Sequence, residues 1–171
     1  MSPRAACRLE TLGFGDVHDY VPGKLDWMAA GLRTEGTNAQ RPRAADVARR
    51  DPPTCRLDER LGAVRERARA SGWDAAVVVG EQGVVLGLLR RKELDGDAGR
   101  PVEQAMRPGP STFRPFVPIQ EMATFMEEHR LDSSPITTSD GRLVGLLLRE
   151  DAVRVARDVQ DAASAGAEER P

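Results

Sequence analysis

The stretch that decides the fold is Gly145-Leu146-Leu147-Leu148-Arg149-Glu150-Asp151, which has a near copy in Gly87-Leu88-Leu89-Arg90-Arg91-Lys92-Glu93. The two copies lie 58 residues apart. Each follows a short apolar run and leads into a charged segment, a pattern typical of a buried strand that ends where a helix begins. Because a junction of this kind can hold a phosphate or a ribose, both copies are candidate binding positions.

The match between the two halves of the chain extends well beyond this motif. A shift of 58 residues aligns Pro52–Leu94 with Pro110–Ala152 without a gap. The identical pairs are Pro52/Pro110, Thr54/Thr112, Arg56/Arg114, Asp74/Asp132, Gly83/Gly141, Gly87/Gly145, Leu88/Leu146, Leu89/Leu147 and Arg91/Arg149. The alternative is two unrelated hairpins that both need Gly-Leu-Leu, but we favour a tandem repeat.

Composition limits the classes of function. The 171 residues carry 25 Lys and Arg against 27 Asp and Glu, so there is no basic field for nucleic acid or an anionic membrane. The two cysteines form no CxxC or Cys/His spacing, which disfavours a structural metal and favours a reducing compartment. No apolar run resembles a signal peptide or a membrane span. We therefore expect a cytoplasmic protein.

The N-terminal part is predicted to be a short α-β-α appendage. Apolar spacing and the following glycines predict a helix over 4–12, then a strand over 16–20 and a helix over 24–31. This appendage covers residues 1–36, and the turn-forming residues 37–43 are predicted to be a linker.

Two repeats follow, each predicted to run strand, helix, strand, strand, helix. The first covers residues 44–100 and the second 101–158, each introduced by a short helix, at 44–50 and 102–106. The predicted strands are 54–56, 75–79, 84–89, 112–114, 134–138 and 143–147. Asp58 is predicted to cap the first long helix and Gly72 to end it. Residues 159–171 are predicted to be a flexible tail, and the fold class to be mixed α/β.

Residues 2–36 resemble the C-terminal end of a rhodanese (sulfurtransferase) domain. The matching residues are Ser2-Pro3-Arg4-Ala5-Ala6, Leu9, Leu12-Gly13-Phe14, Val17, Tyr20, Gly23, Trp27 and Ala30-Gly31-Leu32. In that family the nucleophilic cysteine precedes this helix, whereas Cys7 lies inside it, and we interpret Cys7 as a small buried apolar residue. The chain begins one residue before the helix, so the resemblance implies a remnant, or a longer natural chain, rather than a working enzyme.

Residues 44–157 resemble a tandem pair of cystathionine-β-synthase (CBS) domains, on the evidence of the 58-residue repeat and its Gly-apolar-apolar-x-x-x-acid motif. The resemblance implies two βαββα repeats packed as a pseudo-twofold pair. It also implies two clefts between the repeats that bind AMP, ADP, ATP or S-adenosylmethionine. In the family, a Thr or Ser three residues after the glycine approaches phosphate, and an Asp three residues later binds the ribose.

The two copies depart from this family pattern in different ways. Asp151 matches the ribose acid of the second repeat, but Leu148 replaces the hydroxyl residue. In the first repeat Glu93 stands at the acid position and Arg90 at the hydroxyl position. Guanidinium groups suit phosphate, but a solvated charged turn is an equal alternative for residues 90–92. The simpler alternative for Asp151 is an acid in the first turn of a helix.

The remaining predicted ligand-binding residues also come from the resemblance. Ser133, Ser134 and Pro135 match the strand at the edge of the adenine, and Thr112 and Phe113 match the segment that closes the pocket over the base. The full set is Thr54, Ala75, Val77, Arg90, Arg91, Glu93, Thr112, Phe113, Ser133, Ser134, Pro135 and Asp151.

Three classes of function stay open on the sequence. The favoured one is a regulatory module that senses an adenosyl ligand, with no catalytic residue, no metal and no required cofactor. The second is a structural module with empty clefts, and the third is the regulatory part of a rhodanese-like enzyme. Apolar residues on the repeat helices, Met122, Phe125 and Met126, predict a homodimer. We expect no nucleic acid or membrane partner, and the sequence does not identify a regulated protein.

Overall fold

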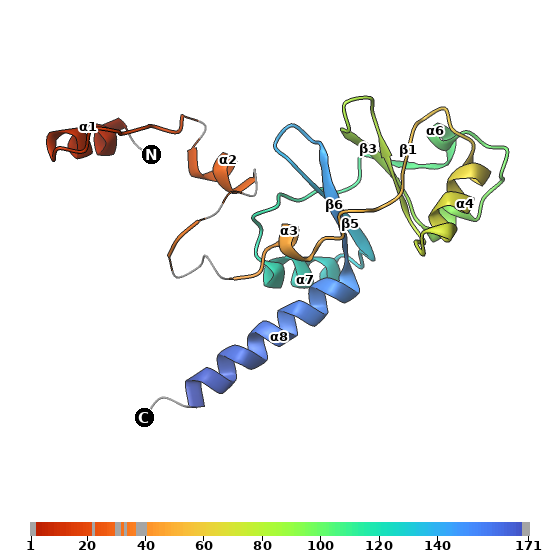
Figure 1. Cartoon of the computed structure of the whole chain (residues 1–171). Coiled ribbons are helices and arrows are strands. Elements are labelled where there is room, and N and C mark those ends of the chain that lie inside the picture. The colour runs from red at the N-terminus through yellow and green to blue at the C-terminus, as the bar shows by residue number, and fades with distance from the viewer. Residues whose placement is uncertain (1–2, 22, 30–31, 33, 37–40, 169–171) are drawn as a thin grey trace.

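The computed structural model describes residues 3–21, 23–29, 32, 34–36 and 41–168. Two β-sheets lie side by side in the body of the molecule (Figure 1). Beyond one sheet lie α4 (Leu61–Ala70) and α6 (Val102–Ala105), and beyond the other lie α3 (Ala44–Val47) and α7 (Ile119–Glu128). The helix α8 (Arg149–Glu168) runs outward from this body. The mixed α/β class predicted from the sequence is confirmed.

The first sheet has four strands in the order β1 (Thr54–Cys55), β2 (Ala76–Val79), β3 (Val85–Leu89) and β4 (Arg107–Pro108). β1 is parallel to β2, and the other neighbours are antiparallel. Every residue of β2 is buried, which explains why its sequence is an unbroken apolar run.

The second sheet has two strands, β5 (Ser133–Thr137) and β6 (Leu143–Leu148). Two isolated β-bridges, each a single pair of residues, extend this sheet in the same pattern as the first sheet. Phe113 pairs in parallel with Ile136, and Arg49 pairs antiparallel with Leu146. A shift of 58 residues maps these pairs onto Cys55 with Val78 and Arg107 with Leu88. The repeat predicted from the sequence is therefore also a repeat in the pattern of backbone pairing.

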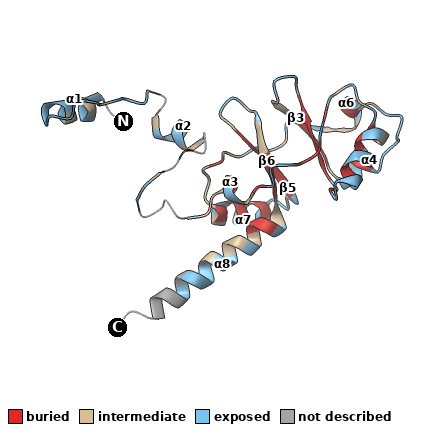
Figure 2. Cartoon of the chain, in the orientation of Figure 1, coloured by how far each residue is buried: buried red, intermediate tan, exposed pale blue. Residues whose placement is uncertain are grey.

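The helices enclose two separate cores. Around the first sheet lie α4 (Leu61–Ala70), α5 (Arg91–Leu94) and α6 (Val102–Ala105), and around the second lie α3 (Ala44–Val47), α7 (Ile119–Glu128) and the start of α8. The apolar faces of α4 and α7 point inward (Figure 2). Burial of these faces, rather than helix propensity, holds such short helices in place.

The chain exchanges two short segments between its repeats. Residues 44–49 and 102–108, which we call the lead-in segments, each pack on the other repeat. In the first, the Ala44 N–H donates to Val117 O at 2.8 Å and the Arg49 N–H to Leu146 O at 3.0 Å. In the second, the Val102 N–H donates to Glu59 O at 2.9 Å. Repeats defined by sequence at 44–100 and 101–158 are therefore not the units that share a core.

The glycine of each motif is explained by this exchange. A Cβ on Gly145 would lie 2.6 Å from Arg49 O, and a Cβ on Gly87 would overlap Met106 Sδ and lie 3.1 Å from Arg107 O. The glycines let a lead-in backbone cross the strand at close range.

A pair of backbone hydrogen bonds marks the pseudo-twofold axis. The Val85 N–H donates to Gly141 O and the Leu143 N–H donates to Gly83 O, both at 3.0 Å. The two bonds are related by the same 58-residue shift, so the two hairpins meet as equivalents.

Several predictions about single elements are wrong. α1 (Pro3–Thr11) and α2 (Gly23–Ala29) form, but residues 16–20 form no strand, because they pair with no backbone in the described part of the chain. No residue of α1 is buried, and Cys7 is exposed rather than packed. The N-terminal part is thus two helices joined by irregular chain.

Three further boundaries differ from the prediction. α4 begins after Arg60, without a side-chain cap, so Asp58 does not cap it. Residues 112–114 form one bridge at Phe113 and no strand. α8 continues to Glu168, so the predicted flexible tail is helical up to that residue, and residues 169–171 lie outside the described part. Gly72 does end α4, with a φ of 73°.

Candidate functional site

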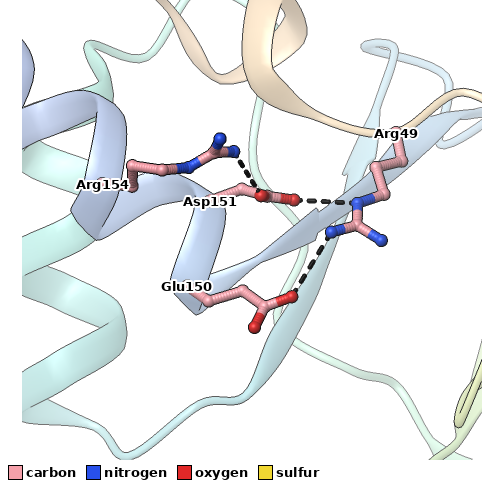
Figure 3. Close-up of polar contacts among 4 residues, drawn as sticks. All are labelled: Arg49, Glu150, Asp151 and Arg154. Carbon is pink, nitrogen blue, oxygen red and sulfur yellow. Dashed lines mark hydrogen bonds and ion pairs between the residues drawn. The ribbon is translucent and has the colours of Figure 1, made fainter.

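Asp151 lies in the first turn of α8, at the end of the motif in the second repeat. Its Oδ2 accepts a hydrogen bond from Arg49 Nε at 2.8 Å, and its Oδ1 accepts one from Arg154 Nη2 at 2.6 Å (Figure 3). Arg49 also reaches Glu150 Oε1 with Nη2, at 3.3 Å. The Asp151 side chain is only 11% exposed, so the predicted ribose acid is a nearly enclosed carboxylate held between two guanidinium groups.

Glu93 is the equivalent acid of the first repeat, and each of its carboxylate oxygens also accepts a hydrogen bond. Oε1 accepts from Arg107 Nε at 2.7 Å, and Oε2 accepts from the Arg90 backbone N–H at 3.1 Å. Burial by itself would raise the pKa of Glu93, but the hydrogen bonds from Arg107 and Arg90 outweigh it and lower the pKa below its ordinary value. Glu93 is therefore ionised at neutral pH.

The two arginines that bind the acids are equivalent. Arg49 and Arg107 differ by the repeat length of 58, and each lies on the lead-in segment that crosses to the other repeat. The sequence reasoning missed both residues. Extending the alignment three residues before Pro52 and Pro110 would have found them as one more identical pair.

The path of the lead-in segments determines which predicted site residues lie near each acid, and the result differs from the grouping predicted from the sequence. Arg49 bonds to Asp151 and then leads into Thr54 and the first sheet. Arg107 bonds to Glu93 and then leads toward Phe113, which pairs with Ile136 of the second sheet. We call these two ion pairs and the residues around them the Asp151 corner and the Glu93 corner. Each corner combines an acid from one repeat with a lead-in segment from the other. The grouping of Asp151 with Ser133 and Ser134, made from the sequence, does not follow this path.

One cavity of about 1040 Å³ is lined by both repeats. Many of its residues occur as equivalent pairs, among them Asp74 with Asp132, Arg90 with Leu148 and Arg91 with Arg149. A cavity of this size can hold a nucleotide-sized ligand.

The cavity contains some of the predicted site residues and omits others. The predicted residues that line it are Ala75, Arg90, Arg91, Glu93 and Ser133. The lining residues missed by the sequence reasoning are Asp74, Arg107, Glu127, Arg130, Asp132, Arg149, Glu150 and Val153, whereas Lys92 and Leu148 had been weighed with the motif. Their signal is position: Asp74, Asp132 and Arg149 belong to the identical pairs of the repeat, and Arg130 follows α7.

The other predicted residues lie outside the lining. Val77 and Pro135 are buried within the sheets, and Ser134 Oγ donates to Ser111 O at 2.9 Å. Phe113 packs edge-on against Phe125, with ring centroids 4.9 Å apart. Thr54, Thr112 and Asp151 also do not line this cavity.

The described residues offer little support for a metal site or a reactive thiol. No group of three His, Cys, Asp or Glu side chains there could hold a metal ion. Burial raises the pKa of the Cys55 thiol to about 12, so this thiol stays protonated at neutral pH. No described helix is both long and apolar enough to span a membrane. The arrangement is suited to binding a charged ligand.

Met122 and Met126, used in predicting a homodimer, are fully buried in the chain's own core. They contribute nothing to an outer surface. Phe125 is half-buried and stacks on His129, with ring centroids 3.9 Å apart. The excess of apolar surface expected on α7 is therefore absent at two of the three positions.

The CBS domain family matches residues 44–95 and 102–158. Three solved structures illustrate the likeness. The cytosolic domain of the Mg²⁺ channel MgtE in complex with ATP is 23% identical, with a TM-score of 0.61, over 67% of this chain and 48% of that chain. CBSX2 in complex with AMP is 18% identical, with a TM-score of 0.62, over 70% and 98%. The CBS domain pair of protein MJ0100, in complex with 5′-methylthioadenosine and S-adenosyl-L-methionine, is 16% identical, with a TM-score of 0.62, over 69% and 98%.

The match leaves residues 1–43 uncovered, so nothing supports the rhodanese resemblance of residues 2–36. The present chain spans about half the length of the MgtE domain and nearly all of the other two. The repeat, the sheet pairing and the family match agree. The chain belongs to the CBS domain family and contains a tandem pair of CBS domains.

Proposed function

We propose that this chain is a regulatory module that binds an adenosyl ligand between its two CBS repeats. The observation that carries the proposal is the cavity lined by equivalent residues of both repeats, with Glu93 and the cations Arg90 and Arg91 in its wall. The three solved relatives support it, because the ligands bound to them share an adenosyl group.

The residues of the cavity suggest distinct roles. Glu93 is ionised and can accept hydrogen bonds from ribose hydroxyls, while Arg90 and Arg91 suit phosphate oxygens. Ser133 lies at the wall where an adenine edge would be placed. Asp151, with Thr54, would be the counterpart of Glu93 in a second cleft, whereas Val77 is fully buried in β2.

Ligand binding would alter the packing between repeats because the acids are already bonded. A ribose that binds Glu93 competes with Arg107, and one that binds Asp151 competes with Arg49. Both arginines lie on the exchanged lead-in segments. A ligand with different affinity for the bonded and released arrangements shifts the balance between them, which is the physical basis for sensing.

Calorimetric titration with adenosine, AMP, ATP and S-adenosylmethionine tests this function. We expect micromolar or weaker binding, because Leu148 cannot supply the hydroxyl bond of the family motif. Glu93→Ala should weaken binding by about ten- to a hundredfold, from loss of charge-assisted hydrogen bonds worth about 1.5–3 kcal/mol. Asp151→Ala does the same if the second cleft is occupied. Absence of heat from all four ligands would reject the proposal.

A structural module with empty clefts is the second candidate. The observation that favours it is that the chain itself supplies hydrogen bonds to both carboxylate oxygens of both acids. Binding that is indifferent to both Glu93→Ala and Asp151→Ala would also favour this candidate.

Self-association stays a prediction for either function. Phe125 is the residue to change, since Met122 and Met126 are buried. If a dimer forms through α7, Phe125→Glu should reduce the mass measured by light scattering. We assign no catalytic role to any residue.

A further inference from the structure

The cavity between the repeats reaches only one of the two equivalent acids. Glu93 and its partner Arg107 line it, whereas their counterparts Asp151 and Arg49 do not. The rest of the lining is largely symmetric. Five equivalent pairs line it from both repeats: Asp74 with Asp132, Ala75 with Ser133, Arg90 with Leu148, Arg91 with Arg149 and Lys92 with Glu150. The cavity therefore extends to the Glu93 corner and stops short of the Asp151 corner.

Arg49 is held by contacts on both repeats. Its guanidinium donates to Asp151 at 2.8 Å and to Glu150 at 3.3 Å. The same group lies over the ring of Trp73, 5.7 Å from the ring centroid. Trp73 is buried in the core of the first sheet, whereas both carboxylates lie on α8 of the second repeat. A planar guanidinium can stack on an aromatic ring and donate in its own plane at the same time, so these contacts fix one position of the side chain.

The first repeat lacks the residues that make the additional contacts. Lys92 stands at the position equivalent to Glu150, and Leu131 at the position equivalent to Trp73. A lysine cannot accept a hydrogen bond from a guanidinium, and a leucine offers no aromatic face. Within the part of the chain that the structure describes, Arg107 makes one ion pair, with the acid of its own corner. This arginine is therefore held less firmly than its counterpart.

We propose that Arg49 closes the Asp151 corner to ligands, so that the chain binds one adenosyl ligand, at Glu93, rather than two. We call the contacts of Arg49 with Asp151, Glu150 and Trp73 the Arg49 lock. The inference rests on the proposed function, because it decides which of the two acids a ribose reaches. At Glu93 a ribose displaces one pair, whose Arg107 side chain is 57% exposed. At Asp151 it would have to separate one guanidinium from two carboxylates and an indole ring.

Calorimetric titration of the full chain with AMP tests the lock through the number of ligands bound. We expect one AMP per chain for wild type and two for Arg49→Ala, because Asp151 is then free to accept hydrogen bonds from a ribose. Adding Asp151→Ala to Arg49→Ala should return the number to one. Arg107→Ala is the matched control, since it removes the equivalent arginine from the corner that is already open, and the number should stay at one.

The fluorescence of Trp73 reports the lock without any ligand. The sequence contains two tryptophans, so in a Trp27→Phe background all tryptophan emission comes from Trp73. Arg49→Ala should increase the quenching of this emission by acrylamide, because the guanidinium no longer lies over the ring. Circular dichroism establishes that each variant is folded. Glu150→Lys introduces the residue of the first repeat at a side chain that is 74% exposed, so it loosens the lock with little risk to folding and should also increase quenching.

Three results overturn the inference. They are two AMP bound per wild-type chain, one AMP still bound per chain in Arg49→Ala, and unchanged quenching of Trp73 in both Arg49→Ala and Glu150→Lys. Failure of the adenosyl function looks different, because AMP then gives no heat with wild type or any variant. In that case the quenching of Trp73 alone decides whether the lock exists.

Discussion

The Asp151 corner and the Glu93 corner occupy equivalent positions, yet they are stabilised differently. In both, an arginine from the exchanged lead-in segment binds one carboxylate oxygen through Nε, at 2.8 Å and 2.7 Å. The second oxygen of Glu93 accepts from the Arg90 backbone N–H, whereas that of Asp151 accepts from the Arg154 side chain. The shared part of the two corners is the ion pair that joins the repeats.

The difference follows from side-chain length. Glu93 is long enough to reach back to the N–H before its helix, as the acid of a capping box does. Asp151 is one methylene shorter and bonds instead to Arg154, one turn later on α8. Position 96, which corresponds to Arg154, is a glycine. Equivalent backbones therefore support different local bonds, and the binding chemistry of the two clefts need not be equal.

The largest expected effect comes from the two motif glycines. A Cβ on Gly145 would lie 2.6 Å from the backbone oxygen of Arg49, which cannot move without displacing the lead-in segment. A Cβ on Gly87 meets mainly the flexible end of Met106. We expect Gly145→Ala to lower the free energy of unfolding by about 3 kcal/mol and Gly87→Ala by about 1–2 kcal/mol, as measured by urea denaturation.

Gly80→Ala is the matched control, because its nearest contact would be an ordinary 3.6 Å. Equal losses in Gly145→Ala and Gly87→Ala would show that the two crossings are equally tight, contrary to this comparison.

A smaller effect is expected from the acids. Asp151→Asn disrupts two ion pairs and Glu93→Gln one, in each case with a carboxylate side chain that is 11% exposed and partners that are more exposed. We expect losses in unfolding free energy of about 2 and about 1 kcal/mol, since exposed partners reduce the strength of such pairs. A larger loss for Glu93→Gln than for Asp151→Asn would reverse the ranking.

The stability difference at Glu93 should also depend on pH. Because its folded pKa is lowered, the Glu93 carboxylate stabilises the protein above the ordinary pKa of about 4.3, and this contribution is lost as pH falls through the folded value. Wild type and Glu93→Gln should therefore differ at pH 7 and converge in acid. If the difference in unfolding free energy between wild type and Glu93→Gln stayed the same in acid, ionisation of Glu93 would not contribute to stability.

The smallest effect is expected from Arg154, whose side chain is 67% exposed. Arg154→Gln should cost about 0.3–0.5 kcal/mol, and salt should reduce this cost, because exposed pairs on one helix are weak and screened. Thermal unfolding at two salt concentrations measures it. A loss as large as that of Asp151→Asn would place the main support of Asp151 on Arg154 rather than on the lead-in arginine.

The sequence by itself determined the repeat and most of the elements within it. The apolar runs of β2, β3, β5 and β6, the glycines of the two hairpin turns and the end of α4 at Gly72 are all local signals, because they depend on side-chain alternation and on backbone conformations open to glycine. The family resemblance of residues 44–157 rested on the same repeat and is confirmed.

The tertiary structure alone decided which parts of the repeats meet. The bond from Arg49 to Asp151 spans 102 residues, and no local pattern indicates that a lead-in segment packs on the other repeat. The cavity gathers residues from both repeats, and the segment 16–20 forms no strand because a strand needs a partner in space. Patterns of hydrophobicity report which side of an element is buried, but not which neighbour buries it, and the neighbours are what assemble the candidate site.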